Sequence, residues 1–229
     1  MNIYISTCNK YRHLLFNQAV LLNKFWDRNK KVKIFGKLPP EEELPKNFEF
    51  VSMGEEDEEW SNQFIKILNQ IPDTHFILLR DDFYFLEPVK KDILEDLEDY
   101  VEAHPNISRV GLQTLDEGYT DAVIPYDTTK NGFQLYYLEQ DHPYLCSFEA
   151  SIFKKKFLEK YIVSGEDSRT AEINMSARAK DKAEIVLLTK ERVLTYRDAM
   201  IGGEERIKFL DNSFYLLTPD GWQKQSVEI

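Results

Sequence analysis

The fold is decided by the stretch His75-Phe76-Ile77-Leu78-Leu79-Arg80-Asp81-Asp82-Phe83-Tyr84-Phe85-Leu86. It opens with an uninterrupted apolar run of strand length, which is typical of a strand that is covered on both faces. Two carboxylates, those of Asp81 and Asp82, stand where this strand should end. Ligands of open α/β sheets collect outside the carboxyl ends of the strands, so the acid pair is placed to hold a cation or a polar substrate. The alternative interpretation is that the pair only caps a turn or binds a lysine.

The composition favours one large domain. The 229 residues are 42% hydrophobic and 13% aromatic, which is sufficient for a full core, and we expect a single domain over residues 1–229. The formal net charge of −11 argues against binding of nucleic acid and leaves at most a peripheral membrane contact, because both partners attract a basic face. Cys8 and Cys146 give neither a disulfide framework nor a metal-binding spacing. With no secretory segment and no run of membrane-spanning length, the expected location is the cytoplasm.

Apolar periodicity around the central stretch predicts strands that alternate with helices. Before it, we expect strands at residues 2–7, 32–36 and 48–52 and helices at residues 15–26 and 60–71. After it, a helix is expected to open at Pro88, and a fifth strand follows at residues 108–114. The β-α-β-β-α-β order up to this acid-tipped strand predicts an α/β fold with right-handed crossovers, as in half of a nucleotide-binding sheet.

Residues 116–143 differ from the rest in composition. They are rich in Gly, Asp, Thr, Tyr and Pro and show little hydrophobic periodicity. A connection of this length in a compact domain is usually functional or disordered. Within it, residues 133–138 are consistent with an added strand. Tyr119 and Tyr126 are candidates to present their rings to a sugar or an organic acceptor, and core packing is the alternative for each.

Further regular elements are predicted beyond Pro143. The first is a helix, because Phe153, Phe157 and Tyr161 share a helical spacing. The elements expected after it are a helix at residues 169–180, strands at 184–188 and 192–196, and a glycine hinge at 202–203.

Several segments together resemble small bacterial glycosyltransferases with the GT-A fold. They are residues 60–71, 77–85, 147–153, 172–176 and the tail 196–203. The resemblance implies an α/β fold of the GT-A (Rossmann-like) type, with a mostly parallel central sheet flanked by helices. It also implies a nucleotide-binding half at residues 1–114 and an acceptor-side half at residues 115–229.

The resemblance further implies transfer of a sugar from a nucleotide-diphosphate donor, with a UDP-sugar expected, to a glycan or other hydroxyl acceptor in bacterial surface polysaccharide synthesis. In that family strand-end acids, here Asp82 with Asp81 beside it, hold a divalent cation, Mn or Mg, on the donor diphosphate. A carboxylate from the later helical region serves as the base that activates the acceptor. Glu172 is the matched residue, with Asp167 and Glu149 behind it.

The sequence around Glu172 favours this assignment. The helix at residues 169–180 follows a polar, glycine-containing loop that would bring its first turns to the ligand end of the sheet. Ile173 and Met175 are expected to shield the Glu172 carboxylate partly from water.

The donor is expected beside the end of the first strand, because parallel strands share one ligand-bearing edge. The predicted donor-binding residues are Ser6, Thr7, Tyr11, Arg12, Trp60, Arg80 and Asp81.

Two positions depart from the family pattern. Arg80 stands where an acid or glutamine usually precedes the acid pair, so a strict Asp-x-Asp and one metal ligand are absent. Phe35-Gly36-Lys37 stands where many such enzymes supply an acid for the uridine base or ribose. A catalytically inactive module that binds a nucleotide or a glycan is therefore the alternative function. A nucleotidyltransferase would normally carry a glycine-rich basic loop after the first strand, which residues 6–10 lack, and a purely structural protein remains a further alternative.

Overall fold

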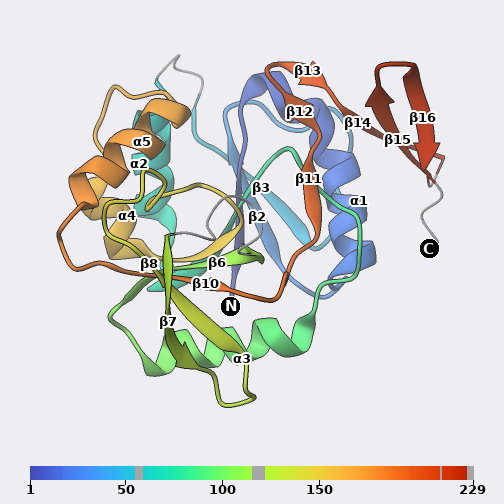
Figure 1. The fold of residues 1–229 in the computed structure, drawn as a ribbon. Helices are drawn as coiled ribbons and strands as arrows, with labels where there is room; N and C mark the ends of the chain where they lie inside the picture. Colours follow the sequence, from blue (N-terminus) through green and yellow to red (C-terminus); the bar gives the residue numbers. More distant parts are fainter. Residues whose placement is uncertain (55–58, 115–121, 212, 226–229) are drawn as a thin grey trace.

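The computed structural model describes residues 1–54, 59–114, 122–211 and 213–225. Within these residues, nine strands form one sheet in the order β3-β2-β1-β4-β9-β6-β10-β8-β7 (Figure 1). In that order the strands are Phe48–Ser52, Val32–Gly36, Ile3–Ser6, His75–Arg80, Ser151–Lys154, Ile107–Thr114, Ile185–Thr189, Gln134–Leu138 and Val123–Thr128. Neighbours among β3, β2, β1 and β4 are parallel, as are β6 and β10, whereas β9 and β8 run antiparallel to their neighbours. The predicted α/β fold with a mostly parallel sheet is therefore confirmed.

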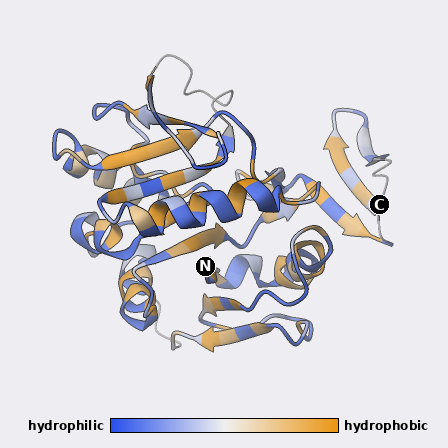
Figure 2. Ribbon diagram, turned by 90° about the horizontal axis from the view of Figure 1, so that it is seen from below, coloured by the Kyte–Doolittle hydropathy of each residue, from blue (hydrophilic) through white to orange (hydrophobic). Residues whose placement is uncertain are grey.

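Helices cover both faces of this sheet. The helices α1 (Leu15–Phe25) and α3 (Lys91–Ala103) share one hydrophobic cluster with the sheet. The helices α2 (Trp60–Gln70), α4 (Lys155–Tyr161) and α5 (Ser168–Ala179) share the other and lie together in Figure 1. Figure 2 shows the apolar strands between helices that carry both polar and apolar residues.

The apolar run of β4 is divided between these two clusters. Ile77 and Leu79 face the cluster with α1 and α3, while Phe76 and Leu78 face the cluster with α2, α4 and α5. Successive strand side chains point to opposite faces, so burial of both faces requires a continuous apolar run. The expectation for this strand is confirmed.

The prediction of a helix that includes Phe153 is wrong. Residues Ser151–Lys154 form β9, which pairs with both β4 and β6, and helix α4 begins only at Lys155. Ile152 and Phe153 are buried in opposite hydrophobic clusters, as a central strand requires. The spacing from Phe153 to Phe157 and Tyr161 is helical, but its first member belongs to the strand that precedes the helix.

Three smaller sheets of two or three strands lie outside the nine-stranded sheet in the described residues. Strand β5 (Phe83–Phe85) pairs antiparallel with β11 (Tyr196–Asp198), which takes the place of the strand predicted at residues 192–196. Strands β12 (Met200–Ile201) and β13 (Glu204–Glu205) form a hairpin whose turn is Gly202-Gly203, both with positive φ, so the predicted hinge is a turn. Strands β14 (Ile207–Leu210), β15 (Ser213–Thr218) and β16 (Gly221–Gln225) form an antiparallel sheet next to α1 (Figure 1).

Other predicted boundaries shift by a few residues. Helix α3 starts at Lys91 rather than at Pro88, and the added strand predicted at residues 133–138 is β8. Tyr119 lies outside the described residues. The division of the chain at residues 114 and 115 stays a prediction.

The packing of β9 generates a stability prediction. Phe153→Ala should lower the free energy of unfolding by about 3–5 kcal/mol, because the ring is fully buried between β4 and β6 and its loss leaves a cavity. Ile124→Ala on β7 is the control, since that side chain is 51% exposed, and should cost less than about 1 kcal/mol. Urea unfolding followed by circular dichroism measures both. Equal effects of the two substitutions would contradict a buried central β9.

Candidate active site

The described residues line two adjoining cavities at the carboxyl edge of the sheet. The first, named here the strand-end cavity, has a volume of about 460 Å³ and includes the ends of β1 and β4. The second, named the outer cavity, has a volume of about 1120 Å³ and reaches β6, β11 and β15. Both are lined by the same four residues where they meet, Tyr144, Glu172, Asp198 and Ile201.

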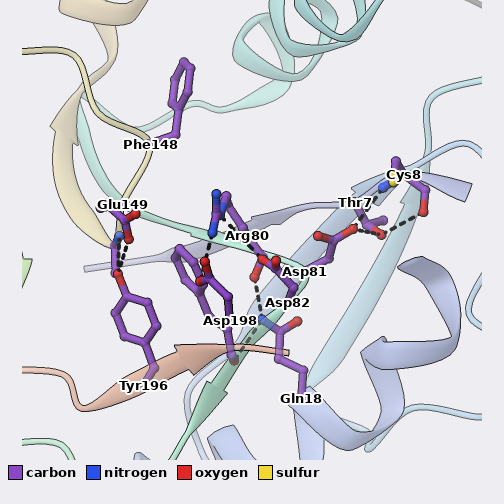
Figure 3. Close-up of polar contacts among 12 residues, drawn as sticks. Thr7, Cys8, Gln18, Arg80, Asp81, Asp82, Phe148, Glu149, Tyr196 and Asp198 are labelled. Carbon is purple, nitrogen blue, oxygen red and sulfur yellow. Dashed lines mark hydrogen bonds and ion pairs between the residues drawn. The ribbon is translucent and has the colours of Figure 1, made fainter. Parts of the chain in front are cut away.

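Asp81 is held by the end of β1. The Thr7 hydroxyl donates a hydrogen bond of 2.8 Å to Asp81 Oδ2, and the Cys8 amide donates one of 3.1 Å to the same oxygen (Figure 3). Burial raises the pKa of Asp81 to about 6, although both hydrogen bonds act in the opposite direction. Asp81 therefore ties β4 to the loop after β1 and also lines the strand-end cavity.

Asp82 lies beside Asp81 but has different partners. Its carboxylate is buried, and its Oδ1 has no hydrogen-bond partner among the described residues. Burial raises the pKa of Asp82 to about 7, and Arg80 opposes that rise. The Asp82 backbone carbonyl accepts a hydrogen bond of 2.7 Å from the Ala199 amide, which fixes this turn against the segment after β11.

Arg80 lies between two carboxylates (Figure 3). Its Nη2 is 2.9 Å from Asp198 Oδ1, and its Nε is 3.4 Å from Asp82 Oδ1. Burial acts to lower the pKa of Arg80, but Asp82 and Asp198 outweigh it and hold that pKa above its usual value. Burial also raises the pKa of Asp198, although Arg80 opposes this rise. The site therefore holds a permanent cation next to the carboxylates of Asp82 and Asp198.

The partners of Asp81 and Asp82 limit the oxygens that are free for a metal ion. Among the described residues, no three His, Cys, Asp or Glu side chains are grouped so that they could hold a metal ion. The Asp81 oxygen that accepts from Thr7 and Cys8 is already used, and Asp82 Oδ1 faces a guanidinium. Whether Asp81 and Asp82 bind a cation stays a prediction.

Glu149 is fixed by two residues to which the sequence analysis assigned no role. The Tyr196 hydroxyl donates a hydrogen bond of 2.7 Å to Glu149 Oε2, and the Gln113 amide donates one of 3.1 Å. The Tyr196 hydroxyl also accepts a hydrogen bond of 3.1 Å from the Ala150 amide. Burial, and then the Glu149 charge, raises the pKa of Tyr196 far above its usual value. Glu149, Gln113 and Tyr196 all line the outer cavity.

Glu172 lies where the two cavities meet, five residues after the N-cap of α5. Its Oε1 accepts a hydrogen bond of 2.6 Å from the Phe148 amide. From the sequence, two apolar residues are expected to shield the Glu172 carboxylate from water. Met175 is buried in the hydrophobic cluster with α2, α4 and α5, whereas Ile173 is 43% exposed and shields the carboxylate little.

Asp167 has a different position from the other predicted bases. It is the N-cap of α5 and accepts hydrogen bonds from the amides of Arg169 and Thr170. Bonds from the Thr170 side chain and amide lower the pKa of Asp167. Asp167 is exposed and is not among the described residues that line either cavity.

Most of the predicted donor-binding residues lie together. Ser6, Thr7, Tyr11 and Trp60 line the strand-end cavity with Arg80 and Asp81. The Trp60 ring stacks on Phe64 at a centroid distance of 4.7 Å and contacts Phe148 at 4.8 Å.

Two predicted positions lie elsewhere. Arg12 pairs with Glu41 at 3.1 Å and is not among the described residues that line the strand-end cavity. Tyr126 is 44% exposed on β7, the last strand of the sheet, where its ring stacks near Tyr137.

Asp198 was also missed as a site residue by the sequence analysis. The available signal was the tail at residues 196–203, which contributes Tyr196 and Asp198 to the cavities. Their partners are Glu149 and Arg80, and strand pairing with β5 brings Asp198 opposite Phe83.

Comparisons with solved structures identify the fold. TarS 1-349 from S. aureus in complex with UDP superposes with a TM-score of 0.54 at 10% identity, covering 86% of this chain and 60% of that chain. The TarS 1-349 complex with UDP-GlcNAc gives a TM-score of 0.51 at 13% identity, covering 88% and 60%. Mannosyltransferase PcManGT from Pyrobaculum calidifontis, in complex with GDP-Man and Mn2+, gives 0.53 at 12%, covering 84% and 55%.

These structures are GT-A glycosyltransferases, so the chain has the GT-A fold. It spans less than two thirds of the length of each of these three proteins. No protein-family model matches the sequence, and no curated protein matches it. Among the described residues, no helix is both long enough and apolar enough to cross a bilayer.

The burial of Asp81 generates a prediction about pH. In the folded chain the pKa of Asp81 is about 6, above the usual 3.8, so folding favours the protonated carboxyl. Its contribution to stability is therefore present below pH 4 and is lost as the pH rises through 6. Asp81→Asn should raise the free energy of unfolding at pH 7 by about 1–3 kcal/mol, because the amide is neutral and its oxygen can still accept from Thr7 and Cys8.

Urea unfolding at pH 4 and pH 7 tests this prediction. Asp141→Asn is the control, because Asp141 is exposed and lines neither cavity. A loss of stability at pH 7 in Asp81→Asn would mean that the ionised carboxylate stabilises the fold and would overturn the expectation.

Proposed function

We propose that the chain is a glycosyltransferase that moves a sugar from a nucleotide-diphosphate donor, with a UDP-sugar as the expected donor, to a hydroxyl of a glycan acceptor. The observation that carries this proposal is that Glu172 lies where two adjoining cavities meet at the carboxyl edge of a GT-A sheet. A transferase needs one site for each substrate and a base between them. Bacterial surface polysaccharide synthesis is the expected process, and a cytoplasmic location is part of the same proposal.

The strand-end cavity suits the donor. Its volume of about 460 Å³ is that of a small-molecule site, and it combines aromatic rings with hydroxyl and charged groups. Trp60 and Tyr11 offer ring faces, and Thr7 offers a hydroxyl. The UDP, UDP-GlcNAc and GDP-Man in the complexes of structurally similar proteins support a nucleotide sugar as the ligand.

The outer cavity suits a glycan acceptor. Its volume of about 1120 Å³ exceeds that of the strand-end cavity, and it is lined by both ring and polar side chains. Tyr144 can pack on the apolar face of a sugar, while Glu149 and Gln113 can bind sugar hydroxyls. Leu216 and Leu217 of β15 form part of its wall, so the C-terminal sheet contributes to acceptor binding in this proposal.

Glu172 is the proposed base. The Phe148 amide uses Oε1, which orients the carboxylate and leaves Oε2 to accept the proton of the acceptor hydroxyl. As that proton leaves, the acceptor oxygen forms a bond to the anomeric carbon, and the bond from that carbon to the donor diphosphate breaks. A positioned general base contributes about 10²–10⁴-fold to such a step.

The divalent cation predicted for Asp82 and Asp81 has one supporting observation, the Mn2+ in the mannosyltransferase complex with GDP-Man. Arg80 competes with such a cation, because its Nε faces Asp82 Oδ1, while Asp81 Oδ2 is already bonded to Thr7 and Cys8. The transfer step proposed here therefore involves no metal ion.

Glu172→Gln tests the function. Transfer should fall by about 10²–10⁴-fold, because the amide keeps the size and the bond from Phe148 but removes the basicity, and affinity for UDP should stay near wild type. Release of UDP from UDP-sugars in the presence of a glycan panel measures the rate, and calorimetry measures the affinity. Glu159→Gln is the matched control, because Glu159 pairs with Lys155 on α4 and lines neither cavity.

Two outcomes would redirect the proposal. A Glu172→Gln variant with most of its transfer rate would exclude Glu172 as the base, and Glu149 would be the next carboxylate to change. A wild-type chain that binds nucleotide sugars without transferring or hydrolysing them would be the catalytically inactive binding module.

A further inference from the structure

Arg80 lies at the strand-end cavity, directly before the acid pair that follows β4. Arg80 is the last residue of that strand, and it lines the cavity with Asp81 and Asp82. The register between β1 and β4 places Arg80 opposite Ser6, so its backbone lies at the end of the parallel strands. A cation at this edge is aimed at the space where ligands of α/β sheets collect.

Contacts to both its side chain and its backbone fix the position of Arg80. Asp198 binds its Nη2 at 2.9 Å, and strand pairing between β5 and β11 holds Asp198 in place. The guanidinium carbon lies 4.6 Å from the centre of the Phe83 ring. At the backbone, the side-chain amide of the buried residue Gln18 donates a hydrogen bond of 2.6 Å to the Arg80 carbonyl.

This fixed cation is open to the strand-end cavity. Arg80 Nε and Asp82 Oδ1 are both buried and are 3.4 Å apart, yet neither has a hydrogen-bond partner among the described residues. These two atoms face each other and are closed to a ligand, but the Arg80 side chain as a whole is 40% exposed and lines the strand-end cavity, so the guanidinium can contact a ligand there. The five donors of a guanidinium match the oxygens of a phosphate group.

We propose that Arg80 takes the place of a divalent cation and binds the diphosphate of the donor, so that donor binding needs no metal ion. This inference rests on the proposed function. In the transfer step, the bond between the anomeric carbon and the diphosphate oxygen breaks, and its electron pair stays on that oxygen. The acceptor oxygen bonds to the anomeric carbon, its proton goes to Glu172, and Arg80 neutralises the charge that develops on the leaving nucleoside diphosphate.

Calorimetric titration of the wild-type chain with UDP is the primary test. The titration is made once in EDTA and once with Mn2+, and the two dissociation constants should agree within about threefold, because the cation that holds the diphosphate belongs to the chain. Binding that occurs with Mn2+ and is lost in EDTA would overturn the role of Arg80. This comparison uses no variant and does not depend on the folding of one.

Arg80→Met tests the residue itself. Its affinity for UDP in EDTA should fall by about 10- to 100-fold, because charge-assisted hydrogen bonds to the diphosphate are lost. Arg178→Met is the matched control, because it removes a bidentate ion pair with Glu166 outside both cavities, and it should bind UDP as the wild type does. Unchanged affinity in a folded Arg80→Met chain would overturn the proposal.

Arg80→Asp should make the binding of UDP depend on Mn2+. A third carboxylate beside Asp81 and Asp82 completes an oxygen-rich site, so UDP should bind this variant at least about tenfold more tightly with Mn2+ than in EDTA. Equal affinity under both conditions would contradict the view that Arg80 is what replaces the metal.

The same titrations, repeated with GDP and CDP, separate failure of this inference from failure of the proposed function. Binding of UDP, GDP or CDP only with Mn2+ would remove Arg80 as the phosphate-binding cation and leave the glycosyltransferase proposal intact. No binding of any of these nucleotides by the wild type, with or without Mn2+, would overturn both.

Discussion

The parallel pairing of β1 with β4 is the constraint on which the site depends. Its register sets Ser6 opposite Arg80, so the residues that follow each strand, Thr7 and Asp81, meet at the same edge and form the 2.8 Å hydrogen bond. That register can be held because both faces of β4 are buried, and a shift by one residue would exchange the side chains between the two hydrophobic clusters. The register of β4 against β1 therefore determines both the packing of the core and the position of Asp81 in the site.

The pairing of β11 with β5 brings side chains from the later part of the chain to the site. Strand β11 lies antiparallel to β5, the short strand directly after the acid pair, and this brings Asp198 to Arg80 and the Tyr196 hydroxyl to Glu149. The strand-end cavity and the outer cavity adjoin because residues of this returning segment contribute to both. The two proposed substrate sites are thus positioned relative to each other by a strand pair outside the main sheet.

Sequence reasoning works where the signal is local. The apolar run of β4 and the position of the acid pair after it can be read directly, because burial on two faces and a strand end leave a mark within a dozen residues. It fails at Ser151–Lys154, because a four-residue strand followed at once by an apolar helix has no period of its own. It also misses Asp198, because the ion pair with Arg80 joins residues more than a hundred positions apart, and nothing in either segment specifies the other.

A fixed guanidinium and a bound metal ion meet the same electrostatic requirement in different ways. A metal ion needs several oxygens free to bind it, whereas a guanidinium needs carboxylates that keep it charged and oriented within a buried site. In this chain Asp198 and Asp82 do the second, and Asp81 is bonded to the loop after β1. Under the proposal that Arg80 replaces a metal ion, this single Arg at the end of β4 determines what the neighbouring carboxylates bind. In that proposal Asp82, which would otherwise ligate a metal ion, holds the guanidinium together with Asp198.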